Sequence, residues 1–126
     1  MTFTTPCFVR VENPEKRKEL IEWLEGIGYT HFPFIHDSCL IATDSDGRIW
    51  LTDANRDGAY DCHTDTDLFK ALAAMNYENY REQWFVEEGR MFKCTSDKIN
   101  GYSYHWLTTR KATAEEIVEY FKNKER

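Results

Sequence analysis

The sequence predicts an α+β fold, a single domain over residues 1–126 in which three helices accompany a mostly antiparallel sheet. Two tight-turn signals, Asp46-Gly47 and Glu88-Gly89, each separate two short β-prone runs and therefore predict antiparallel hairpins. Three further segments combine a capping residue with apolar side chains at helical spacing, which predicts helices. A chain of 126 residues suits one domain with one hydrophobic core.

The first part of the chain predicts a strand, a helix and a second strand. Residues 7–11 form a β-prone run, and Asn13 then acts as the N-cap of a helix over residues 14–25, with a proline at its first position. The apolar stripe of this helix comprises Leu20, Leu24 and Ile27, flanked by Ile21 and Trp23. Residues 29–35 are expected to form a strand that is broken or lies at an edge, because Pro33 cannot donate a ladder hydrogen bond.

The middle of the chain, residues 39–75, predicts a hairpin, an acid-rich loop and a helix. The runs 39–43 and 48–52 are the two strands of the first hairpin. Thr64 is expected to cap the helix, with Asp67 as the acid of a capping-box-like pair. The apolar face of this helix comprises Leu68, Leu72 and Met75, widened by Phe69 and Ala73.

The last part predicts a second hairpin, a strand and a helix. Residues 83–86 and 91–94 flank the second turn, and residues 102–107 alternate in the manner of a strand. Thr113 and Glu116 form a capping box that begins the last helix. The apolar side of that helix comprises Ile117, Val118, Tyr120 and Phe121.

Composition and charge exclude several classes of function. The net charge of −6 argues against nucleic-acid binding, since a phosphate backbone requires a basic face. No apolar run approaches the roughly 20 residues of a membrane span, so no membrane association is expected. Residues 1–11 lack the basic start and apolar core of a signal peptide, and the four cysteines contain no C-x-x-C pair. A cytosolic protein with reduced, mostly buried thiols is therefore expected.

The most specific chemical pattern is D-x-N-x-D-G-x-x-D at residues 53–61. It resembles the calcium loops of EF-hand and dockerin-like proteins, in which alternate residues of a tight turn bring several oxygens to one hard cation. The cofactor that this resemblance implies is Ca²⁺. The implied metal ligands are the side chains of Asp53, Asn55 and Asp57, the carbonyl of Ala59, and Asp61 directly or through water.

The closing position of the loop departs from this pattern. A bidentate acid is expected there, but the chain has Thr64, and Asp65 follows one residue late. The element before the loop also has the character of a strand rather than a helix. Asn, Asp and Gly favour turns in their own right, so a polar turn followed by a helix cap is the interpretation that we favour over a cation site.

Two other groups of residues suggest binding chemistry. A soft-metal site would draw on His31, His36, Cys39, Cys62 and His63, but their spacing matches no established zinc pattern. Tyr102, Tyr104 and Trp106 share one face of a strand and form a candidate ligand platform that would stack a base or sugar ring. Packing within a sheet is the more common role of such aromatic residues.

Several short pieces of the chain resemble small uncharacterised proteins of phage and gut-bacterial genomes. These pieces are residues 6–10, 61–62, 68–75, 83–85 and 92–94. The resemblance covers most of the chain and implies a cytosolic protein in a phage or mobile-element context. It implies no particular activity.

The sequence predicts no catalytic residues. His105 lies beside Ser103, but no G-x-S-x-G elbow, P-loop or G-x-G-x-x-G motif accompanies them. We therefore expect a non-enzymatic accessory protein that binds a protein partner or a small ligand. The alternative is a cation-binding module or metal-dependent hydrolase that uses the loop at residues 53–61. A structural role through homo-oligomerisation is a third hypothesis.

Overall fold

The computed structural model describes residues 7–31, 39–43, 47–52, 58–75, 83–93 and 109–124. Three helices and eight strands lie within these ranges, in two mostly antiparallel sheets, which confirms the predicted α+β class. In chain order the elements are β1 (Cys7–Arg10), α1 (Pro14–Gly26), β2 (Thr30–His31), β3 (Leu40–Thr43), β4 (Arg48–Thr52), β5 (Tyr60–Asp61), α2 (Thr66–Ala74), β6 (Trp84–Glu87), β7 (Arg90–Lys93), β8 (Thr109–Lys111) and α4 (Ala114–Lys124).

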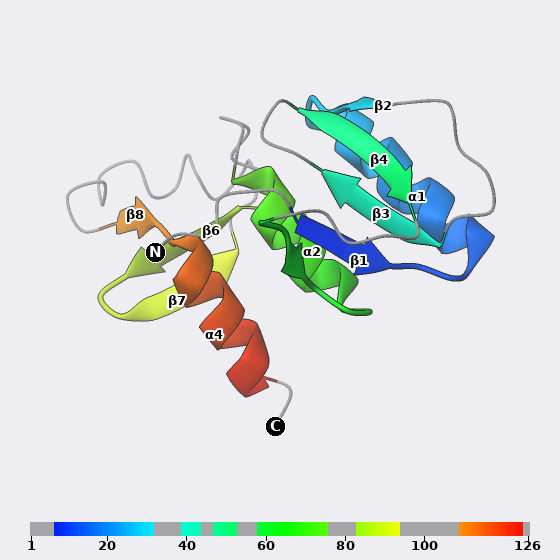
Figure 1. The fold of residues 1–126 in the computed structure, drawn as a ribbon. Helices are drawn as coiled ribbons and strands as arrows, with labels where there is room; N and C mark the ends of the chain where they lie inside the picture. The colour runs from blue at the N-terminus through cyan, green and yellow to red at the C-terminus, as the bar shows by residue number, and fades with distance from the viewer. Residues whose placement is uncertain are drawn as a thin grey trace.

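The larger sheet has five strands in the order β2-β4-β3-β1-β5 (Figure 1). Its strands β1 and β3 pair antiparallel, as do β3 and β4, and the second pair is the predicted first hairpin. Gly47, which precedes β4, has a φ of 81°, a conformation that glycine adopts without steric cost. Strand β5 pairs parallel with β1, and β2 pairs parallel with β4. The sequence did not predict β5, because a strand of two residues is too short to show an alternating pattern.

The smaller sheet has the order β7-β6-β8, and both of its ladders are antiparallel. Glu88 and Gly89 have φ values of 53° and 81°, as a two-residue hairpin turn of type I′ requires. The predicted second hairpin is therefore confirmed. The described strands are divided between two sheets, with α2 between them (Figure 1). The strand predicted at residues 102–107 lies outside the described residues.

Local capping explains where the helices begin. The side chain of Asn13 accepts hydrogen bonds from the backbone N–H groups of Glu15 and Lys16, at 2.8 and 3.1 Å, so the predicted N-cap of α1 is confirmed. None of the helices in the described part of the chain is long and apolar enough to cross a membrane.

The predicted cap of α2 is wrong by one residue. Asp65, not Thr64, is the N-cap, and its Oδ1 atom accepts a hydrogen bond of 3.0 Å from the backbone N–H of Leu68. The physical reason lies in the preceding turn. His63 takes a φ of 56°, and its backbone N–H donates to Oδ1 of Asp61 at 2.7 Å, so the chain completes this turn before the helix starts.

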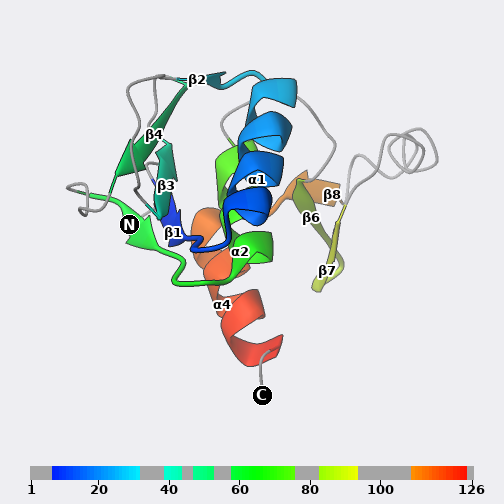
Figure 2. The same ribbon diagram turned by 90° about the vertical axis from the view of Figure 1, so that its right-hand side faces the viewer.

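Helix α2 lies at the centre of the molecule. It packs against β1 on one side and α4 on the other (Figure 1). Figure 2 shows α1 and α2 on the same side of the larger sheet. One apolar cluster extends from Cys7 and Val9 of β1, through α2, to Ile117 and Phe121 of α4. The buried residues of α2 are Leu68, Phe69, Ala71, Leu72, Ala73 and Ala74. Because four of its five predicted core positions are among these, the helical pattern located this part of the core correctly.

Candidate binding groove

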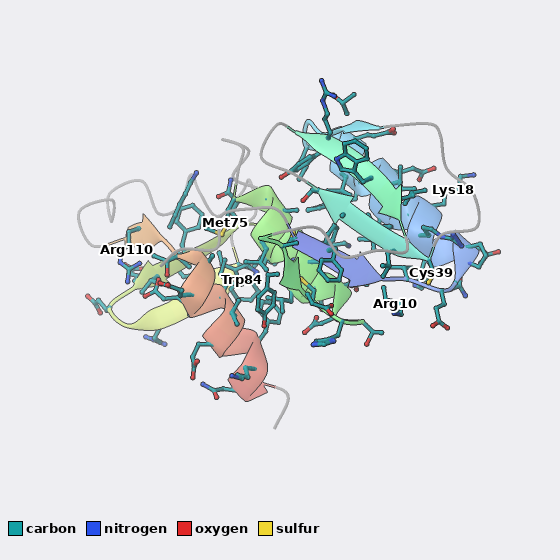
Figure 3. The ribbon with its side chains drawn as sticks, in the orientation of Figure 1. Arg10, Lys18, Cys39, Met75, Trp84 and Arg110 are labelled. Carbon is teal, nitrogen blue, oxygen red and sulfur yellow. The ribbon has the colours of Figure 1, made fainter. Side chains whose placement is uncertain are left out.

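A groove with a volume of about 810 Å³ lies between the turn of the β6–β7 hairpin and one face of α4. One wall comes from the hairpin and the other from α4 and the residues just before it. Figure 3 shows Arg110 beside the hairpin at the start of α4, at the opposite end of the molecule from Arg10 and Cys39. The groove therefore joins two segments that lie about 20 residues or more apart in the chain, a separation that no local sequence pattern reports.

The floor of the groove is apolar and firmly supported. Val86 and Met91 are direct partners across the hairpin ladder, so their side chains lie on the same face of the sheet. Tyr120 of α4 lines the groove, and its ring centroid lies 5.1 Å from that of Trp84. The Trp84 ring in turn meets Phe121 edge-on at 5.5 Å. These aromatic contacts hold α4 against β6 and keep the two walls in place.

The rim of the groove is acidic. Of the described residues that line it, four are glutamates and one, Arg110, is a cation. Glu88 lies at the hairpin turn, while Glu115 and Glu119 lie on α4, and all three are exposed. Acidic side chains therefore border the apolar floor from both walls.

The N-terminus of α4 is fixed by a complete capping box. The backbone N–H of Thr113 donates to Oε1 of Glu116 at 2.9 Å, and the backbone N–H of Glu116 donates to Oγ1 of Thr113 at 3.1 Å. This confirms the capping box that the sequence predicted. The sequence did not predict the part played by Arg110, whose two terminal nitrogens donate to Glu116 at 2.8 and 2.7 Å.

This pair keeps Glu116 ionised. The guanidinium of Arg110 and the backbone N–H of Thr113 lower the pKa of Glu116 from 4.5 to about 2, against a smaller opposing effect of burial. The same carboxylate raises the pKa of Arg110. At neutral pH, Glu116 is therefore a fixed negative charge that accepts hydrogen bonds and has no proton to donate.

The predicted cation loop is described only in part. Asp53, Asn55 and Asp57 lie outside the described residues, while Ala59 and Asp61 lie within them. Gly58 has a φ of 78°, which agrees with the sharp turn that the pattern expects at this glycine. The cation site therefore remains a prediction.

The end of this loop faces a second, smaller cavity of about 390 Å³, which Asp61, Asp65 and Phe121 help to line. One oxygen of each of the two carboxylates already accepts a backbone N–H, from His63 in the case of Asp61 and from Leu68 in the case of Asp65. Within the described part of the chain, no three His, Cys, Asp or Glu side chains form a group that could hold a metal ion.

The cysteines agree with the expectation of free thiols as far as they are described. Cys7, Cys39 and Cys62 form no disulfide, and Cys7 and Cys62 are buried. Burial, followed by a hydrogen bond with Cys7, raises the pKa of the Cys62 thiol far above its ordinary value, so Cys62 is a poor nucleophile. Cys39 is half-buried and accepts a hydrogen bond of 3.2 Å from Arg10 (Figure 3).

The aromatic platform of Tyr102, Tyr104 and Trp106 lies outside the described residues, as does His36. Comparison of the chain with protein-family models, with curated proteins and with solved structures gave no significant match.

Proposed function

We propose that this chain is a non-enzymatic binding protein, which holds a segment of a protein partner or a small ligand in the groove between the β6–β7 hairpin and α4. The observation that carries the proposal is the groove itself, a concave site with an apolar floor and a few charged groups at its rim. The resemblance to phage and gut-bacterial proteins would make this an accessory role.

The chemistry of the groove supports binding rather than catalysis. A general acid needs a pKa near the working pH, and Glu116 has a pKa of about 2. Glu88, Glu115 and Glu119 are exposed to water, whereas catalytic carboxylates are commonly buried. The four glutamates therefore suit electrostatic recognition of a ligand.

Binding can be tested by titrating the isotope-labelled chain with a library of small molecules and short peptides and following backbone amide resonances by NMR. A ligand of the groove should shift the resonances of Val86, Met91 and Tyr120 and leave those of β3 unchanged. Met91→Lys, which places a charge on the apolar floor, should abolish these shifts. A screen without any binder, together with hydrolysis of simple ester or phosphoester substrates by the purified chain, would contradict the proposal.

The second candidate function is a cation-binding module or metal-dependent hydrolase based on the loop at residues 53–61. One observation favours it: Gly58 has the positive φ that the calcium-loop pattern requires at that position. Turns of other kinds require the same conformation, so this candidate ranks below the groove. A calcium titration, argued in the Discussion, separates the two candidates.

A further inference from the structure

Both walls of the groove carry acidic side chains. The described lining residues carry a net charge of −3, from four glutamates and one arginine. Glu88 contributes from the hairpin, and Glu115 and Glu119 contribute from α4. A cation that enters between the two walls would thus meet acidic groups from both sides.

The one cation of the described lining is already engaged. Arg110 makes two short hydrogen bonds to Glu116, in the bidentate arrangement that matches a guanidinium to a carboxylate. An anionic ligand would have to compete with Glu116 for this guanidinium and would meet the remaining glutamates. The groove is therefore poorly suited to phosphate or to an acidic peptide.

The apolar floor of the groove favours a ligand that has apolar groups as well as a positive charge. Val86, Met91 and Tyr120 offer apolar contact area, and the flexible thioether of Met91 adapts to side chains of different shape. The face of the Tyr120 ring also attracts cations. A simple inorganic cation would leave this floor unused, whereas a lysine or arginine side chain covers it with its aliphatic stem while its charged head reaches the rim.

We propose that the groove binds a basic segment of a partner protein, in which lysine or arginine residues alternate with apolar ones. This inference rests on the proposed binding function and names the chemistry of the partner. A second copy of this chain is a poor occupant, because both copies would carry a net charge of −6 and the same acidic rim. The net charge would also attract a basic partner from a distance and raise its association rate.

The test uses three synthetic peptides that share one leucine and alanine framework and carry lysine, glutamine or glutamate at the same positions. Isothermal titration calorimetry with the full chain measures their affinities at about 0.05 M and about 0.5 M NaCl, where screening differs strongly. The lysine peptide should bind on the order of tenfold more tightly than the glutamine peptide at low salt, and the glutamate peptide should bind least. The advantage of lysine should shrink at high salt.

Two double variants with the same change in net charge locate the attraction. Glu88→Lys with Glu119→Lys reverses one charge on each wall and leaves the Thr113–Glu116–Arg110 contacts in place. This variant should bind the lysine peptide on the order of tenfold more weakly than the wild type does. Glu12→Lys with Glu22→Lys changes two exposed residues away from the groove and should lower the affinity for the lysine peptide by less than about twofold. Circular dichroism confirms that each variant is folded.

Several results would overturn the inference. Equal binding of the glutamine peptide at Val86, Met91 and Tyr120 would leave the binding function in place but remove the preference for basic partners. Equal losses in the two double variants would mean that only the net charge matters. Binding of none of the peptides would restrict the groove to small ligands. If the chain self-associates and the resonances of Val86, Met91 and Tyr120 shift as it does so, the occupant would be a second copy.

Discussion

At the scale of single residues, the side chain of Glu116 has three structural roles. It caps α4 through Thr113, holds Arg110 at the rim and contributes negative charge to the groove. All three depend on its being ionised. The contribution to stability is modest and sensitive to salt, because the side chains of Arg110 and Glu116 are 56% and 36% exposed.

The pH dependence of stability should therefore change in Glu116→Gln. In the folded state the pKa of Glu116 is lowered from 4.5 to about 2, so the native chain binds fewer protons there than the unfolded chain. The stabilisation is complete above pH 4.5 and is lost as the pH falls through about 2. The gap in unfolding free energy between wild type and Glu116→Gln should be widest above pH 4.5 and narrow towards pH 2, as measured by denaturant unfolding at each pH. Glu22→Gln, at an exposed site, is the control, and a constant gap would contradict the assignment.

Residue-level chemistry also decides the calcium hypothesis. If the loop at residues 53–61 binds Ca²⁺, thermal unfolding should shift upwards when Ca²⁺ replaces EDTA, because a ligand at about 100 times its Kd stabilises the native state by roughly 2.7 kcal/mol. Replacing Asp53 and Asp57 with alanine should abolish the shift, and replacing the exposed Glu12 and Glu22 should not. A midpoint that does not respond to Ca²⁺ would make the loop a polar turn.

At the scale of elements, mutation can distinguish the N-cap of α2 that the structure shows, Asp65, from the one that the sequence predicted, Thr64. Because Asp65 accepts the N–H of Leu68, Asp65→Ala should lower the unfolding free energy by about 1 kcal/mol, the usual cost of losing an N-cap. Thr64 is exposed and lies outside the helix, so Thr64→Ala should be nearly neutral. Urea unfolding of the two variants measures both values. The reverse order of effects would support the cap that the sequence alone predicted.

The elements that could be predicted are those whose signals lie within a few residues. Asn13, the Glu88-Gly89 turn and the Thr113–Glu116 box each act on neighbours within four residues, and the structure confirms all three. Strand β5 and the parallel pairing of β2 with β4 depend on partners far along the chain. Strands β2 and β5 have only two residues each, so neither carries a periodic signal.

The groove could not be predicted for the same reason. The sequence does contain its acidic residues and its capping box, but it does not show that the β6–β7 hairpin packs opposite α4. That arrangement depends on tertiary contacts such as the meeting of Trp84 with Tyr120 and Phe121. The sequence pointed instead to the loop at residues 53–61, since a short motif is visible where a composite surface is not.

At the scale of the whole molecule, α2 connects parts that would otherwise have little in common. The larger sheet packs on one side of it and α4, with the smaller sheet, lies on the other (Figure 1). The hydroxyl of Tyr29 donates a buried hydrogen bond of 3.0 Å to the carbonyl of Ala73, which ties the segment after α1 to the end of α2. The apolar cluster is continuous across all of these elements. We therefore predict that the two sheets unfold together as a single domain.

This cooperativity can be tested with Phe69→Ala and two fluorescent reporters. Phe69 is fully buried in the shared cluster, so its loss should cost about 3–5 kcal/mol. Trp50 reports on the larger sheet and Trp84 on the smaller one, each in a variant whose other tryptophans are replaced by phenylalanine. Urea unfolding should give coincident transitions for both reporters, and Phe69→Ala should shift both midpoints equally. Phe92→Ala, at a half-buried site on β7, is the control and should cost less. If only the Trp50 transition moved in Phe69→Ala, α4 and the smaller sheet would fold independently, and the groove would belong to a unit of its own.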